Sequence, residues 1–181
     1  MDELIMAVDM SLRSTGVVVI DAADDSLVHY ELIKTDPMSF PDDEQTIMHY
    51  QDRFHDLLLK FMAVKQFVIE KPALGAKSSR KDVIAGAYWA VRSVVYRYFP
   101  HVLIGTVTVN TWRNWLTTKE ERKVFDKACQ DPLKNVVVSK LPDDVWRKFV
   151  LYVEENSWDW KSVFDISDAY GLALYRSSLN K

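Results

Sequence analysis

Four carboxylates interrupt or open apolar segments of this 181-residue chain, and they are its strongest candidates for chemistry. Asp9 and Glu70 each end a short apolar run, whereas Asp165 and Asp168 lie three residues apart at the start of an apolar segment. Two carboxylates about 5 Å apart repel by about 3 kcal/mol at an effective dielectric constant of about 20. A shared site would therefore favour a divalent cation. Hard cations such as Mg²⁺ prefer oxygen ligands, and two such ions could activate a water and stabilise the leaving oxygen of a phosphodiester.

Each of these carboxylates also has a purely structural interpretation. Asp9 can cap a turn, and Glu70 can pair with a lysine such as Lys71. Asp165 can be a helix N-cap, with Asp168 as a favourable charge in the first helical turn. The catalytic interpretation gains its specificity from the set, because all four lie at a strand end or a helix start.

The elements that must position these residues follow from the apolar pattern. Short apolar runs predict five strands, near residues 4–8, 16–20, 27–33, 66–69 and 102–109. Short turns join the first three, which favours antiparallel hairpins. Helical stripes at 47–61 and 84–98 separate the last two strands from their predecessors, which favours parallel crossovers. We therefore predict an α/β fold: a five-stranded mixed sheet, three strands antiparallel and then two parallel, flanked by helices.

Length and composition predict one domain over residues 1–181, with a charged helical insertion at about 117–160. A final helix is expected over 166–179, entered through Asp165. The single cysteine, Cys129, excludes an internal disulfide framework and a cysteine-based zinc site, and it favours a reducing compartment. No apolar run approaches the roughly 20 residues of a membrane span. We therefore expect a cytoplasmic protein without a membrane partner.

The net charge of −3 conceals a basic middle segment, since residues 61–148 carry 16 lysines and arginines but only 8 acidic residues. Such a segment can present a positive face to a polyanion. The alternative is a set of solvated helix faces. The predicted DNA-backbone contacts are, first, the residues after Glu70, and second, one side of a later helical pattern. They are Lys71, Lys77, Ser78, Arg80 and Lys81, then Lys119, Arg122 and Lys123.

Three segments together resemble the RuvC-type Holliday-junction resolvases, with most similarity to the bacteriophage versions. They are residues 8–16 (VDMSLRSTG), 68–70 (VIE) and 165–169 (DISDA). The resemblance implies a ribonuclease H-like fold and a homodimer that nicks two opposing strands of a four-way DNA junction. It also implies two Mg²⁺ or Mn²⁺ ions per active site and in-line attack of a metal-bound water, which leaves a 5′-phosphate and a 3′-hydroxyl. For a phage-encoded protein, the compartment would be the host cytoplasm.

The resemblance also implies roles by position. Asp9 matches the central carboxylate that touches both metals, Glu70 the second ligand, and Asp165 and Asp168 the closing pair. Two features depart from the family pattern. The stretch 117–160 is longer and more charged than expected before the final helix, and residues 71–74 (KPAL) lack the aromatic wedge that follows the glutamate in the bacterial enzymes. The missing wedge puts the reading of a cognate sequence and the opening of the junction in question.

Three other functions share features with this sequence. A nuclease of the same fold could prefer flaps or RNA–DNA hybrids, and a noncatalytic protein could only bind junctions. Four intact carboxylates argue against the second of these, because a binder has no need to gather negative charge near DNA. An actin-like ATPase or sugar kinase shares the strand, Asp and Gly-rich opening. It needs two such domains, for which 181 residues are too few.

Overall fold

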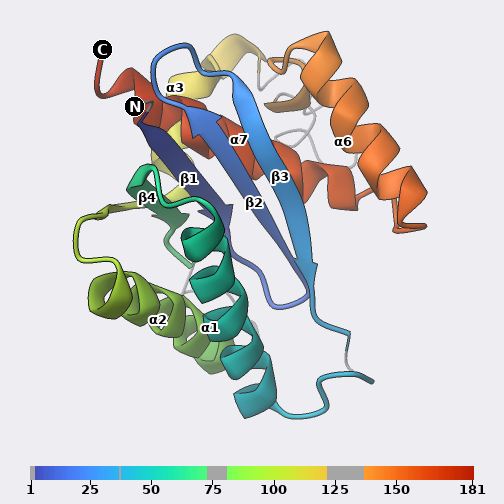
Figure 1. The fold of residues 1–181 in the computed structure, drawn as a ribbon. Coiled ribbons are helices and arrows are strands. Elements are labelled where there is room, and N and C mark those ends of the chain that lie inside the picture. Colours follow the sequence, from blue (N-terminus) through green and yellow to red (C-terminus); the bar gives the residue numbers. More distant parts are fainter. Residues whose placement is uncertain (1–2, 37, 73–80, 122–136) are drawn as a thin grey trace.

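A mixed five-stranded sheet forms the centre of the computed structural model (Figure 1), which describes residues 3–36, 38–72, 81–121 and 137–181. The strand order is β3-β2-β1-β4-β5. β1 pairs antiparallel with β2, and β2 with β3, whereas β4 and β5 run parallel to β1. The predicted arrangement is therefore confirmed. The strands are β1 (Leu4–Asp9), β2 (Ser14–Asp21), β3 (Leu27–Lys34), β4 (Val64–Glu70) and β5 (Leu103–Val107).

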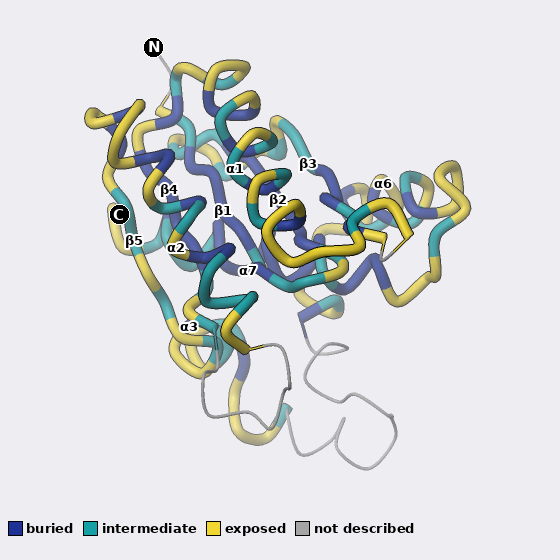
Figure 2. Tube along the Cα trace, turned by 90° about the horizontal axis from the view of Figure 1, so that it is seen from below, coloured by how far each residue is buried: buried dark blue, intermediate teal, exposed yellow. Residues whose placement is uncertain are grey.

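Helices cover both faces of this sheet (Figure 1). One face packs against α1 (Asp43–Lys60) and α2 (Lys81–Tyr98). The opposite face packs against α3 (Val109–Leu116), α6 (Asp143–Glu155) and α7 (Ser162–Ser178). The strands at the centre of the sheet and the inner sides of the helices are buried, as Figure 2 shows.

Side chains of β1 alternate between the two faces of the sheet and contribute to the apolar clusters on both. Met6 and Val8 belong to the apolar cluster with α1 and α2, whereas Ile5 and Ala7 belong to the cluster with α7. Successive residues of a strand point to opposite faces of its sheet. Asp9 therefore follows Ile5 and Ala7 onto the α7 face, and it is the first residue of that row that is not fully buried.

Helix starts agree with the sequence predictions only in part. Asp42 caps α1 by accepting a 2.7 Å hydrogen bond from the backbone N–H of Gln45. The prediction that the last helix is entered through Asp165 was wrong, because α7 begins at Ser162 and Asp165 lies within its first turn. The short helix after β5 begins at Val109.

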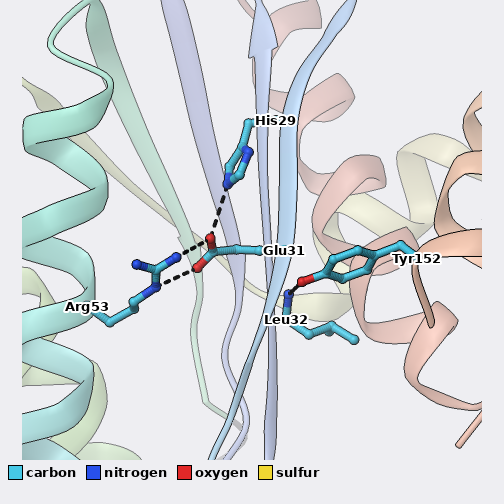
Figure 3. Close-up of polar contacts among 5 residues, drawn as sticks. All are labelled: His29, Glu31, Leu32, Arg53 and Tyr152. Atoms are coloured by element: carbon cyan, nitrogen blue, oxygen red, sulfur yellow. Dashed lines mark hydrogen bonds and ion pairs between the residues drawn. The ribbon is translucent and has the colours of Figure 1, made fainter. Parts of the chain in front are cut away.

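Polar contacts of β3 tie both helical layers to this edge strand (Figure 3). The buried Glu31 carboxylate accepts hydrogen bonds from Arg53 of α1, at 3.0 and 2.5 Å, and contacts the His29 ring at 3.1 Å. Burial raises the pKa of Glu31, but the contacts with His29 and Arg53 outweigh it, so that this pKa lies below its ordinary value. On the other side, the Tyr152 hydroxyl accepts the Leu32 backbone N–H at 3.3 Å.

The charged segment predicted at about 117–160 contributes to the core where the structure describes it. Val145, Phe149 and Val153 of α6 are buried against the α7 face. Residues 122–136 of this segment lie outside the described residues. Within the described ranges, none of the helices combines the length and apolar character that crossing a bilayer requires.

Candidate active site

Asp9 and Glu70 end neighbouring parallel strands at the same edge of the sheet. Val8 pairs with Ile69, so the next residue of each strand is one of these carboxylates. Parallel neighbours lie about 4.8 Å apart and point to the same face. Glu70 follows Val68 onto the α7 face, as Asp9 follows Ala7. Both residues are half-buried. The structure therefore brings these two predicted residues together.

Asp165 reaches this edge because α7 lies directly on β2. Gly16 pairs with Asp9 across β1 and β2. A Cβ atom built on Gly16 would lie 2.0 Å from the backbone oxygen of Asp165, so only glycine permits this approach. The start of α7 is thus held over the strand pair that ends in Asp9.

Asp168 lies one helical turn further along α7 and is 2% exposed. Its Oδ2 atom accepts a 2.6 Å hydrogen bond from Nη2 of Arg113, a residue of α3. The Arg113 side chain is itself only 16% exposed. The fourth predicted carboxylate therefore forms a buried ion pair with Arg113 of the same chain.

Glu70 is also contacted by α3. The indole N–H of Trp112 donates a 2.7 Å hydrogen bond to Oε2 of Glu70, and the Trp112 ring is fully buried. Trp112 and Arg113 are consecutive, and they hold carboxylates from two different elements. Gly171 of α7 permits the close packing, since a Cβ atom there would lie 2.9 Å from the Trp112 ring. Helix α3 therefore connects the end of β4 to α7 at this edge of the sheet through these two contacts.

A second cation approaches the site from β3. Nζ of Lys34 donates to the hydroxyls of Ser14 and Ser162, at 2.8 and 2.5 Å. Burial lowers the pKa of the Lys34 ammonium, and attraction to Asp165 and Asp159 opposes that shift without cancelling it. Lys34 thus places positive charge beside the first turn of α7.

The donors that the strand ends and α7 supply are carboxylate oxygens, which suit Mg²⁺ or Mn²⁺. Within the described part of the chain, however, no three His, Cys, Asp or Glu side chains lie together closely enough to hold a metal ion. Trp112 and Arg113 engage Glu70 and Asp168 in this arrangement. The donor chemistry fits a divalent cation, and the ligand set itself stays a prediction.

Three of the predicted DNA contacts fall within the described residues. Lys71 follows Glu70 directly, Lys81 is the first residue of α2, and Lys119 follows α3 at a short distance along the chain; all three are exposed. The remaining predicted contacts lie outside the described residues. They are Lys77, Ser78, Arg80, Arg122 and Lys123.

A cavity of about 160 Å³ adjoins Lys71 on the α2 side of the sheet, and Trp89, Arg92 and Thr106 contribute to its lining. Arg92 donates to the Tyr88 hydroxyl at 2.7 Å and to Oγ1 of Thr106 at 3.1 Å. Its guanidinium lies 4.9 Å from the centre of the Trp89 ring, within the range of a cation–π contact. A cationic and aromatic surface therefore continues from the strand end onto α2.

The residues that sequence reasoning missed are Trp112, Arg113 and Lys34. The sequence around these residues does not reveal their contacts, because their partners lie on distant segments of the chain. The one available signal was the adjacent Trp and Arg on a short helix directly after a predicted strand, where an aromatic donor and a cation can reach a carboxylate edge.

The sequence matches no protein-family model, and no curated protein sequence matches it. Solved structures do match. Thermus thermophilus RuvC in complex with a Holliday junction substrate aligns with a TM-score of 0.62 and 14% identity, over 96% of this chain and 91% of RuvC. A further T. thermophilus RuvC structure aligns with a TM-score of 0.60 and 14% identity, over 95% and 92%. The yeast mitochondrial Holliday junction resolvase Ydc2 aligns with a TM-score of 0.61 and 8% identity, over 96% and 77%.

These similarities establish the fold. The chain has the architecture of RuvC-type resolvases, and the ribonuclease H-like sheet flanked by helices is the predicted one. The closer likeness to bacteriophage versions stays a prediction.

Proposed function

We propose that this chain is a metal-dependent endonuclease that resolves four-way DNA junctions. The observation that carries this proposal is the placement of Asp9 and Glu70 at adjacent strand ends, beneath the helix that bears Asp165 and Asp168. The fold is that of RuvC, whose structure with a Holliday junction substrate aligns over nearly the whole chain.

In this proposal, the four carboxylates would hold Mg²⁺ or Mn²⁺, two ions per centre. When bound, a divalent cation lowers the pKa of a water and neutralises charge that develops on a phosphodiester. Asp9 is central, since it neighbours Glu70 along the sheet and the start of α7 across it. Trp112 orients Glu70 through its indole N–H, so that one carboxylate oxygen stays directed by the protein. Lys34 offsets part of the negative charge near Asp165.

The proposed assembly is a homodimer, because one chain provides a single set of four carboxylates and a junction is resolved by nicks in two opposing strands. Each protomer would cut one strand. The flanking cations Lys71 and Lys81, together with Lys77, Ser78 and Arg80, would contact the DNA backbone, which positions a duplex without reading its sequence. Lys119, Arg122 and Lys123 form the second proposed set.

The decisive experiment compares labelled four-way junction, flap, duplex and RNA–DNA hybrid substrates, with Mg²⁺, Mn²⁺ or a chelator. We expect paired nicks in the junction that require the metal. Asp9→Asn should lower cleavage by at least about a thousandfold, since it removes a charged group that acts in the transition state. Junction binding and thermal stability should stay close to wild type.

Asp24→Asn is the matched control, because this exposed residue lies in the turn at the opposite end of the sheet. It should cleave like wild type. Cleavage mainly of flaps or hybrids would support the proposed metal centre but assign it a different substrate. Tight junction binding without cleavage of any substrate would contradict the proposal and favour a noncatalytic binder.

A further inference from the structure

The ion pair between Arg113 and Asp168 occupies the position where a metal ligand is expected. Oδ2 of Asp168 lies 2.6 Å from the guanidinium, and the carboxylate side chain is 3% exposed. The guanidinium also packs 5.1 Å from the centre of the Trp112 ring, which fixes its position from α3. A buried carboxylate needs a nearby cation to stay ionised, and Arg113 supplies one from within the chain.

We propose that Arg113 is the internal counterion of Asp168 and competes with the divalent cation for this carboxylate. The inference rests on the proposed metal centre. In the described arrangement no three acidic side chains form a ligand group, and the Asp168 oxygen is already bonded to Arg113. A guanidinium and a divalent cation repel each other when they share one carboxylate. Loading the centre therefore requires Asp168 to exchange one cation for the other.

This exchange has an advantage for the metal-free protein. The Asp168 carboxylate is buried in α7, and the positive charge of Arg113 keeps it paired, and α7 docked, until a cation arrives. Arg113 can play this part because α3 is packed on α7 through Trp112 and Gly171, so that the guanidinium needs to move only locally. Metal binding is weaker as a consequence, because the incoming ion must displace Arg113 from Asp168.

The test measures Mn²⁺ binding by calorimetry and thermal unfolding, without DNA and without a cleavage readout. Arg113→Gln should bind Mn²⁺ about tenfold more tightly than wild type, which corresponds to about 1.4 kcal/mol. Its melting temperature should be lower than that of wild type in chelator, and the gap should narrow at saturating Mn²⁺, since the ion stabilises the form that binds it.

Arg147→Gln is the matched control, because it removes the same formal charge from an exposed position on α6. It should leave Mn²⁺ affinity within about twofold of wild type. Arg113→Lys retains the charge without the planar fork, so it should bind Mn²⁺ with an affinity between those of wild type and Arg113→Gln. This variant keeps the test decisive if Arg113→Gln does not fold.

The direction of the change in Mn²⁺ affinity distinguishes competition from a purely positioning role of Arg113. If Arg113 only positions Asp168 for the metal, Arg113→Gln and Arg113→Lys will bind Mn²⁺ more weakly or equally, and the competition is refuted while the metal centre stands. If wild type itself binds no Mn²⁺, and Asp9→Asn behaves identically, the proposed metal centre fails and the competition fails with it.

Discussion

Trp112 uses its only polar atom, the indole N–H, on the carboxylate of Glu70, while its ring is fully enclosed between the sheet and α7. The contact joins a core residue to a group proposed to act in catalysis. Packing and orientation can therefore be separated by a substitution that keeps an aromatic ring and removes the donor.

We expect Trp112→Phe to lower the cleavage rate of junctions by about tenfold or more, because a hydrogen bond to a charged group contributes about 1.5–3 kcal/mol. Glu70 would lose its fixed direction, whereas the flanking cations would be unchanged. Two quantities are measured, the single-turnover cleavage rate and the affinity for the junction. The affinity should stay within about twofold of wild type.

Trp115→Phe on the same helix provides the control, since Trp115 is 47% exposed and contacts the Tyr175 ring instead. It should cleave at the wild-type rate. Full activity of Trp112→Phe would show that the indole N–H does not orient Glu70.

Sequence reasoning at this scale identified residues whose type conflicts with their surroundings. Asp9 and Glu70 were recognisable because a charged side chain at the end of an apolar strand is energetically unfavourable unless it is paired or bound to a cation. Arg113 conflicts with nothing nearby in the sequence. Its role depends on the packing of α3 against α7, which no local pattern encodes.

At the scale of elements, the contact between β2 and α7 decides where the last two acidic residues lie. Gly16 has no side chain where the backbone of Asp165 passes. A strand and a helix normally keep a layer of side chains between them, and here that layer is absent at one point. The position of α7 along β2 is thereby fixed.

Gly16→Ala should therefore destabilise the protein by about 3 kcal/mol, the upper part of the range for overpacking, since backbone atoms cannot move aside as a side chain can. Denaturant unfolding measures this loss. Cleavage should fall further than the unfolded fraction explains, because α7 must shift away from Asp9.

Gly105→Ala is the comparison on β5. A Cβ atom there would lie 3.7 Å from the nearest side-chain atom, an ordinary contact. Its stability should remain within about 0.5 kcal/mol of wild type, as for a substitution that meets no neighbour closely. Equal effects of both substitutions would attribute the loss to strand glycines in general, instead of to the approach of α7.

The strands were predictable because apolar runs and short turns specify hairpins, and long helical connections specify parallel crossovers. The first residues of helices were less predictable from the sequence. Asp165 has the side chain of a good N-cap, yet α7 begins at Ser162, because Val163 and Phe164 are buried and extend the helix backwards by packing. Tertiary burial outweighed the local capping preference.

For the molecule as a whole, the charge distribution matters more than the net charge of −3. The basic residues of the middle segment include Lys71 and Lys81, which flank the strand ends that carry Asp9 and Glu70. DNA drawn to these lysines would be brought to the acidic centre that is proposed to cut it.

Replacing Lys71 and Lys81 together by alanine should reduce the salt dependence of junction binding. Each lost phosphate contact lowers the slope of log affinity against log salt by about 0.9, so the pair should lower it by about 1.8. Binding measured across a salt series, with chelator to prevent cleavage, gives this slope.

Lys60 and Lys65 form a matched pair, since both are exposed near the opposite end of β4. Their double alanine variant changes the net charge equally but should leave the slope unaltered. An unchanged slope in the Lys71 and Lys81 variant would remove this end of the sheet from the DNA interface.

The contact of Gly16 with Asp165 has a consequence for the order of assembly. It joins the first hairpin of the chain to its last helix, so the candidate centre depends on a contact between segments that lie far apart in the sequence. Local hairpins form quickly, whereas contacts between distant segments wait for loop closure. During synthesis, the ribosome releases β1, β2 and β4 long before α7. A nascent chain therefore carries Asp9 and Glu70 without their partners, and the candidate centre is completed only at the last stage of folding.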